Sequence, residues 1–208
     1  NIKKITMVLK PEEYDISYFD PQLTTYRHNA GYTVYNKWPR ISNDFVPHAQ
    51  STGEYWKDLA LRLKIDYSLE GKKVLEIGCA KGFVVEGLRD LGVDAYGIDV
   101  SQYAIDCARE DIKPYLKVAD VRTALADYKN KEFDLIFSRW TLCCFTDEEI
   151  AKMIIQMNRI AVQQVHWMME TGNATYYNLK IIQQWKDGFN WKTGTIFTRG
   201  NQGEVFKK

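Results

Sequence analysis

The sequence predicts an α/β fold in which a mostly parallel sheet carries helices on both faces. From residue 74 onward, short apolar stretches of the length of buried strands alternate with segments whose apolar residues recur at helical spacing. The first of these strands runs directly into a glycine-rich turn at residues 78–82, and a helical pattern follows it. Strands that alternate with helices normally pair in parallel, because each connecting helix returns the chain to the same edge of the sheet.

The stretch from Glu76 to Phe83 has the composition of a ligand-binding turn between a strand and a helix. Gly78 permits a turn that a side chain would obstruct, while Ala80 and Gly82 leave the main chain nearly bare for the close approach of a ligand. A helix that begins near Phe83 directs its free N–H groups into the same gap. This combination predicts a nucleotide-like ligand at the turn.

The spacing within the turn restricts the kind of nucleotide. A dinucleotide site requires G-x-G-x-x-G, whereas here Gly78, Ala80 and Gly82 are followed by Phe83. The chain contains no G-x-x-x-x-G-K-[ST] sequence, which excludes a P-loop. Asp99 ends the second predicted strand, roughly 20 residues after the turn, where its carboxylate can accept both hydroxyls of a ribose. The expected ligand therefore has a ribose and no pyrophosphate.

Helices are expected on both sides of this turn. Residues 51–54 form a capping-box pattern ahead of apolar residues at helical spacing. The helix after the turn is expected to bury Val84, Leu88 and Leu91. Ser101 follows the second strand at a position where its hydroxyl is expected to cap the next helix.

The second half of the chain continues the alternation and ends in a hairpin. Thr146 and Glu149 form a capping box that opens a helix with one apolar stripe, made of Ile150, Met153, Ile154, Met157 and Ile160. The elements expected after it are a strand at 165–169, a helix at 177–185, and two antiparallel strands at 195–199 and 204–206 around a turn at 200–203.

These motifs resemble those of the class I S-adenosylmethionine-dependent methyltransferases. The first motif of that family, an acidic residue ahead of G-x-G-x-G, is matched by residues 76–82, with Ala80 in place of the middle glycine. Asp99 and residues 118–121 and 133–138 match the family's second, third and fourth strand ends in the same order. The resemblance implies a Rossmann-like, doubly wound, mostly parallel seven-stranded sheet with a C-terminal antiparallel hairpin.

The resemblance also implies a cofactor and its contacts. S-adenosyl-L-methionine is the expected cofactor, and no metal is expected. The residues expected to bind the cofactor are Glu76, Gly78, Cys79, Ala80, Gly82, Phe83, Asp99, Val100, Asp120, Val121 and Ser138. We expect a cofactor-binding domain over residues 51–208 and a lid or substrate segment over residues 1–50, with an aromatic cluster of Tyr26, Tyr32, Tyr35 and Trp38.

Methyl transfer is an in-line displacement, so the protein mainly has to hold the acceptor close to the methyl group and exclude water. An oxygen or amine acceptor benefits from a base, and His166 in the fifth predicted strand is the expected catalytic histidine. Arg139, at the end of the fourth predicted strand, is the second catalytic candidate. The alternative for His166 is a structural bond to a neighbour, and the alternative for His28 and His48 is a solvated loop position.

The composition restricts the partners and the location of the protein. Lys and Arg number 28 against 27 Asp and Glu, so the net charge of +1 gives no general attraction to DNA or to an anionic membrane. The four cysteines include no C-x-x-C pair, and no apolar run approaches the roughly 18 residues of a membrane span. We therefore expect a cytoplasmic protein, and the sequence does not indicate its oligomeric state.

The acceptor is expected to be a small molecule or the sugar of a glycan. DNA adenine methyltransferases carry [DNS]-P-P-[YFW] after the fourth strand, where residues 138–141 read Ser-Arg-Trp-Thr, and neither Cys143 nor Cys144 follows a proline as the cytosine-C5 nucleophile does. Residues 78–83 and 96–101 resemble those of bacterial methyltransferases associated with sugar and surface-glycan pathways. The alternatives are an RNA or protein methyltransferase, or a relative that binds the cofactor without turnover.

Overall fold

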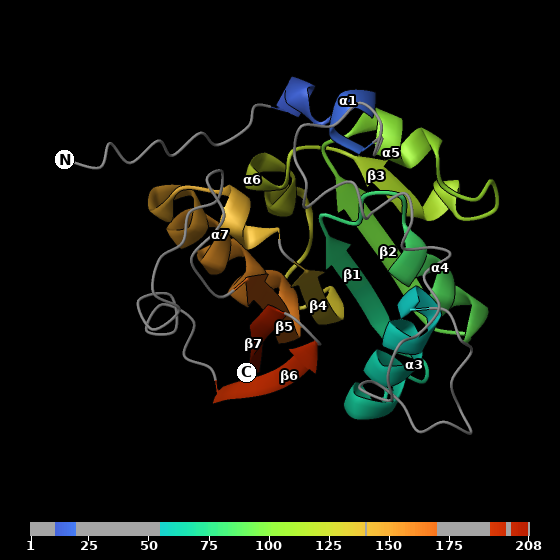
Figure 1. Ribbon diagram of the computed structural model, residues 1–208. Coiled ribbons are helices and arrows are strands. Elements are labelled where there is room, and N and C mark those ends of the chain that lie inside the picture. Colours follow the sequence, from blue (N-terminus) through green and yellow to red (C-terminus); the bar gives the residue numbers. More distant parts are fainter. Residues whose placement is uncertain (1–10, 20–54, 140, 170–191, 199–200, 208) are drawn as a thin grey trace. The chain divides into compact units, whose positions relative to one another are not determined.

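The structure is a computed structural model that describes residues 11–19, 55–139, 141–169, 192–198 and 201–207. The chain divides into two compact units, one of residues 11–120 and one that contains residues 121–208 together with residues 1–10. Each unit has its own parallel strands and its own helices, which can be followed by their labels in Figure 1.

The described part of the unit of residues 11–120 contains three parallel strands. The central strand β2 (Asp94–Asp99) pairs with β1 (Lys73–Ile77) on one side and with β3 (Leu116–Val118) on the other. α3 packs on α4, α4 packs beside β2, and α5 packs beside β3 (Figure 1). The helical segments that the structure describes in this unit are η1 (Pro11–Glu13), α1 (Ile16–Phe19), α3 (Tyr55–Tyr67), α4 (Phe83–Asp90), α5 (Gln102–Asp106) and η4 (Lys113–Tyr115).

β1 forms because its apolar residues are buried on both faces, as parallel strands require. Val74, Leu75 and Ile77 are all fully buried. Ile77 at the end of β1 lies opposite Ile98, next to the end of β2. The turn after β1 and the carboxylate at the end of β2 are therefore neighbours at one edge of the strands.

In the other unit, β4 (Phe133–Arg139) pairs in parallel with β5 (Ala161–Met169). β7 (Asn201–Lys207) pairs antiparallel with β5 and with β6 (Lys192–Thr198). Among its described residues, the helical segments are α6 (Val121–Ala124), η5 (Leu125–Asp127), η6 (Leu142–Cys144) and α7 (Asp147–Ile160). No helix in the described part of the chain is long and apolar enough to cross a membrane.

The capping box predicted for α7 is confirmed. The Glu149 N–H donates to Thr146 Oγ1 at 3.3 Å, and the Thr146 N–H donates to Glu149 Oε2 at 2.8 Å. The predicted apolar stripe of α7 is buried. β5 begins directly after this helix at Ala161 rather than at Val165, because Ala161 already has extended φ and ψ.

The alternation of strands and helices is confirmed for β1 to β5, whereas several details differ. Leu91 is half-buried and caps the end of α4 instead of lying in its buried face. Asn201 belongs to β7 and not to the predicted turn, because it pairs with Thr198 of β6. The predicted capping box at 51–54 and the predicted helix at 177–185 lie outside the described residues. The complete seven-stranded sheet stays a prediction.

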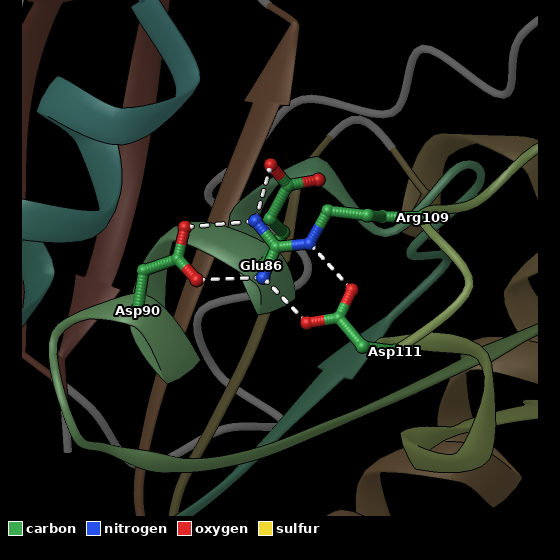
Figure 2. A network of polar contacts seen from close by, with 4 residues as sticks. All are labelled: Glu86, Asp90, Arg109 and Asp111. Carbon is green, nitrogen blue, oxygen red and sulfur yellow. Dashed lines mark hydrogen bonds and ion pairs between the residues drawn. The ribbon is translucent and has the colours of Figure 1, made fainter.

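Arg109, in the segment that follows α5, connects this segment to α4 by hydrogen bonds to a cluster of carboxylates, shown in Figure 2. Its Nη1 and Nη2 donate to the two carboxylate oxygens of Asp90 at 3.0 and 2.6 Å, and Nη1 also donates to Glu86 at 3.1 Å. Nε and Nη2 donate to Asp111 at 2.6 and 3.0 Å. These hydrogen bonds raise the pKa of Arg109 and lower the pKa values of Asp90 and Asp111.

Candidate functional site

The turn after β1 has a left-handed main chain at three alternate residues. The φ angle is 73° at Gly78, 46° at Ala80 and 70° at Gly82. A left-handed residue with a side chain is disfavoured by about 1–2 kcal/mol, so glycine suits the first and third positions and Ala80 is strained. The N–H groups of Gly78 and Cys79 both donate to the carbonyl of Ile98, at 2.8 and 3.1 Å, which holds the turn beside β2.

The carboxylate of Asp99, the last residue of β2, holds this turn by a hydrogen bond to its main chain. Its Oδ2 accepts the N–H of Ala80 at 2.7 Å, and its Oδ1 accepts the N–H of Ser101 at 2.9 Å. The first of these bonds stabilises the strained conformation at Ala80. Burial raises the pKa of Asp99, although hydrogen bonds from main-chain N–H groups act in the opposite direction.

Further predicted cofactor residues lie at the same edge of the strands. Glu76 in β1 is 3% exposed, so a carboxylate is buried directly before the turn. Val100 follows Asp99 and is half-buried. The N–H of Ala119 donates to the carbonyl of Asp99 at 2.8 Å, which places half-buried Asp120 just past the end of β3. The structure thus brings three of the predicted acidic residues to one strand edge.

The side chain of Cys79 packs inside the protein, whereas Phe83 is half-buried. Cys79 is fully buried, and a Cβ at Gly97 would lie 2.6 Å from its Sγ, so the thiol fits because Gly97 has no side chain. Burial raises the pKa of this thiol well above its usual range. The ring of Phe83 lies 6.3 Å from that of Trp56 in α3.

Aromatic residues near the N-terminus lie beside the turn, and the sequence analysis missed them. Phe19 in α1 is 4% exposed and packs with Ala80 of the turn and Ala104 of α5. The half-buried side chains that pack against this cluster are Tyr14, Tyr18 and Tyr103. The helical spacing of residues 14 and 18 was the available signal, but a sequence does not show which later residues such a face contacts. The predicted aromatic cluster of Tyr26, Tyr32, Tyr35 and Trp38, together with His28 and His48, lies outside the described residues.

In the unit of residues 121–208, Ser138 and His166 form a buried polar pair. Parallel pairing of β4 and β5 places them opposite one another, and both are fully buried. Ser138 Oγ lies 2.6 Å from His166 Nδ1, and His166 Nε2 lies 3.4 Å from Gln164 Oε1. Gln164 Nε2 in turn donates to Asn158 Oδ1 at 2.9 Å. A proton on His166 Nε2, with the Ser138 hydroxyl donating to Nδ1, satisfies both contacts of the imidazole.

The environment of His166 determines its protonation state. Burial lowers the pKa of His166 to about 3, so the imidazole is neutral at physiological pH. A base with so low a pKa takes up a proton poorly near neutrality, which favours a positioning role over proton removal. Of the other predicted residues in this unit, Arg139 is the half-buried last residue of β4, and Val121 is buried at the start of α6.

The residues of the 11–120 unit fit a ligand that carries a ribose. The two observed bonds use about half of the four acceptor positions of a carboxylate, so the oxygens of Asp99 can still accept from ribose hydroxyls. In the left-handed turn, the residues between Gly78 and Gly82 are Cys79, Ala80 and Lys81, and the side chain of Ala80 is a single methyl group. Cys79 points away into the core, and residues 79–82 of the turn are buried, with Phe19 packed against Ala80.

Comparison with known proteins shows that part of the chain is similar to methyltransferases. A family model described as a methyltransferase domain matches residues 75–166. The matched residues contain the turn, Asp99 and the pair of Ser138 and His166.

Several relatives of the chain are named as O-methyltransferases. The ubiquinone biosynthesis O-methyltransferase of Methylococcus capsulatus is 36% identical over 73 residues, which are 33% of this chain and 31% of that protein. The chain thus spans under a third of that relative's length. The magnesium-protoporphyrin O-methyltransferase of Rhodobacter capsulatus is 24% identical over 180 residues, which are 83% of this chain and 75% of that protein.

Solved structures show the same fold. A TehB-like SAM-dependent methyltransferase from Corynebacterium glutamicum matches with a TM-score of 0.58 at 18% identity, over 76% of this chain and 90% of that one. The magnesium protoporphyrin IX methyltransferase of Synechocystis with bound SAH also has a TM-score of 0.58, at 16% identity, over 73% and 80% of the two chains. The fold is therefore the Rossmann-like α/β fold of these methyltransferases, and residues 75–166 match a methyltransferase domain.

Proposed function

We propose that this protein transfers a methyl group from S-adenosyl-L-methionine to an oxygen atom of a small molecule, the sugar unit of a glycan included. The observation that carries the proposal is the left-handed turn at Gly78–Gly82, held against β2 by the carboxylate of Asp99. The same strand edge carries two further carboxylates, and the domain that contains it matches a methyltransferase family model.

The residues of the 11–120 unit would bind and orient the cofactor. When bound, S-adenosylmethionine supplies an electrophilic methyl group on a positively charged sulfur. In our proposal Asp99 accepts the ribose hydroxyls, the main chain from Gly78 to Phe83 lies along the cofactor, and Asp120 with Val121 borders the adenine. Buried Glu76 adds negative charge close to the turn, which is complementary to a cationic cofactor.

The residues at the ends of β4 and β5 would complete the proposed machinery. We propose that Ser138 contacts the cofactor and that His166 holds the Ser138 hydroxyl in one orientation through their 2.6 Å contact. Arg139 is the proposed partner for an anionic group of the acceptor, because it is a half-buried cation at the carboxyl end of β4. The domain then needs no strong base, since displacement at a sulfonium methyl depends mainly on placing the acceptor.

The names of the relatives and the net charge of the chain support the proposed class of acceptor. Ubiquinone biosynthesis and magnesium-protoporphyrin O-methyltransferases are named for small-molecule pathways, and the net charge of +1 provides no field for attracting RNA. The sugar acceptor is supported by the resemblance of residues 78–83 and 96–101 to glycan-associated methyltransferases. We further propose that residues 1–50 contribute the lid over the acceptor and that the protein works in a reducing cytoplasm.

A labelling experiment tests this proposal. The full chain is incubated with S-adenosylmethionine that carries an isotope-labelled methyl group, and separate reactions contain phenols, sugars, RNA or protein. Production of S-adenosylhomocysteine and the position of the label are then read by mass spectrometry. In the phenol or sugar reactions, we expect to find the labelled methyl group on an oxygen atom of the acceptor. Label in RNA or protein would establish one of the alternative acceptor classes, and cofactor binding without label in any reaction would establish a relative without turnover.

A further inference from the structure

Ser101 lies where three hydrogen bonds of the 11–120 unit meet. Its side chain is 2% exposed, and its hydroxyl donates to the carbonyl oxygen of Tyr14 at 2.5 Å. The same oxygen accepts the N–H of Ala104 at 3.0 Å and so caps α5. Its main-chain N–H donates to Asp99 Oδ1 at 2.9 Å. One residue therefore connects the start of the chain, α5 and the carboxylate that fixes the turn.

The segment Pro11–Phe19, here called the N-terminal segment, is attached by apolar contacts as well. Phe19 packs with Ala80 and Ala104. Within the segment, the ring centroids of Tyr14 and Tyr18 lie 4.8 Å apart. Ala80 is also the residue whose N–H binds the second oxygen of Asp99 at 2.7 Å. Both neighbours of the Asp99 carboxylate thus touch the N-terminal segment directly.

We propose that Ser101 is a positioning residue for cofactor binding, which links the docked N-terminal segment to the carboxylate of Asp99. The inference rests on the proposed role of Asp99 in holding the ribose. A carboxylate that already has its orientation fixed binds two hydroxyls at a smaller entropic cost. The docked segment fixes the positions of Ser101 and Ala80, and their N–H groups fix the orientation of the Asp99 carboxylate. Docking of the segment therefore strengthens cofactor binding. By reciprocity, the bound cofactor strengthens docking of the segment to the same degree.

Calorimetric titration of the full chain with S-adenosylhomocysteine tests this coupling. Ser101→Ala removes the hydroxyl, and we expect it to weaken binding by about five- to tenfold, the effect of one or two hydrogen bonds. Phe19→Ala removes the apolar contact and is expected to weaken binding in the same direction. The double variant should lose less than the product of the two effects, because both changes release the same segment. Ser101→Thr keeps the hydroxyl and should restore binding.

Thr146→Ala is the matched control, because Thr146 also caps a helix but lies in the other unit. It should lower the melting temperature and leave the affinity for S-adenosylhomocysteine unchanged. Hydrogen exchange supplies a second measurement: the N–H groups of Tyr18 and Phe19, which bond to Asp15, should exchange more slowly when the wild-type chain binds S-adenosylhomocysteine. Ser101→Ala should remove this protection.

The outcomes separate the inference from the proposed function. If the wild-type chain binds S-adenosylhomocysteine and both Ser101→Ala and Phe19→Ala bind it equally well, Ser101 is a helix cap only and the coupling is overturned. If the wild-type chain itself does not bind S-adenosylhomocysteine, the proposed function fails first and the coupling fails with it.

Discussion

Asp99 has two tasks that depend on one carboxylate. In the structure its oxygens hold the N–H groups of Ala80 and Ser101, and in the proposed complex the same oxygens accept ribose hydroxyls. The two tasks are compatible because a carboxylate accepts more than one hydrogen bond per oxygen. The strained φ of Ala80 explains why the turn requires such an anchor.

Replacing Asp99 should weaken cofactor binding, and it should also lower the free energy of unfolding, because the N–H groups of Ala80 and Ser101 lose their acceptor. Asp99→Ala removes charge-assisted hydrogen bonds, so we expect S-adenosylhomocysteine to bind about 1.5–3 kcal/mol less tightly, or roughly 10- to 150-fold. Asp94→Ala is the control, because Asp94 lies at the opposite, exposed end of the same strand. Equal affinities of the folded Asp99→Ala variant and the wild type, measured by calorimetry, would show that Asp99 does not hold the ribose.

The buried His166 should make stability depend on pH in a defined window. The pKa of His166 falls from 6.5 to about 3 on folding, so between these values the unfolded chain binds the additional proton. The free energy of unfolding should therefore rise with pH by up to about 1.4 kcal/mol per pH unit. This contribution is complete above pH 6.5 and is lost as the pH falls toward 3.

The measurement compares urea unfolding of the wild type and His166→Asn between about pH 4.5 and 7. The asparagine amide can still accept the hydroxyl of Ser138 but does not titrate. We expect the difference in slope between the two proteins to be confined to the window below pH 6.5. Parallel curves for the two proteins would mean that His166 is protonated as easily in the folded as in the unfolded chain.

Among the elements, α4 depends on the carboxylate cluster around Arg109 as well as on its buried face. Arg109→Ala should lower the free energy of unfolding by about 1 kcal/mol or less, because the guanidinium is partly exposed and solvent screens its pairs. The loss should shrink at high salt. Arg62→Ala, which breaks the i,i+4 pair with Asp66 on α3, should lose less. A larger loss for Arg62→Ala in urea unfolding would contradict a connecting role of Arg109.

Local signals explain which elements the sequence could predict. The capping box of Thr146 and Glu149 lies within one turn of helix, and the glycine turn within five residues, so both are visible without the fold. The hydrogen bond between Ser101 and Tyr14 joins residues 87 positions apart, and no periodic pattern in the sequence predicts it. The same holds for Ser138 and His166, which meet only because of the register of β4 and β5. Their residue types were noted in the sequence, but their pairing depends on the fold.

For the whole molecule, the turn and its anchor distinguish between nucleotide classes. The turn is left-handed at Gly78, Ala80 and Gly82, and Phe83 replaces the third glycine that a dinucleotide site uses to pack helix on strand. Phe83 instead packs beside Trp56 of α3. These features favour a mononucleoside cofactor, in agreement with the methyltransferase domain matched over residues 75–166.

The most direct test of the proposed function is a calorimetric titration of the full chain with S-adenosylhomocysteine and, separately, with NAD. We expect saturable binding of S-adenosylhomocysteine and much weaker binding of NAD, because the turn lacks the spacing that grips a pyrophosphate. The Asp99→Ala variant should lose the first interaction in the same experiment. Tighter binding of NAD than of S-adenosylhomocysteine would contradict the assignment of this domain to methyl transfer.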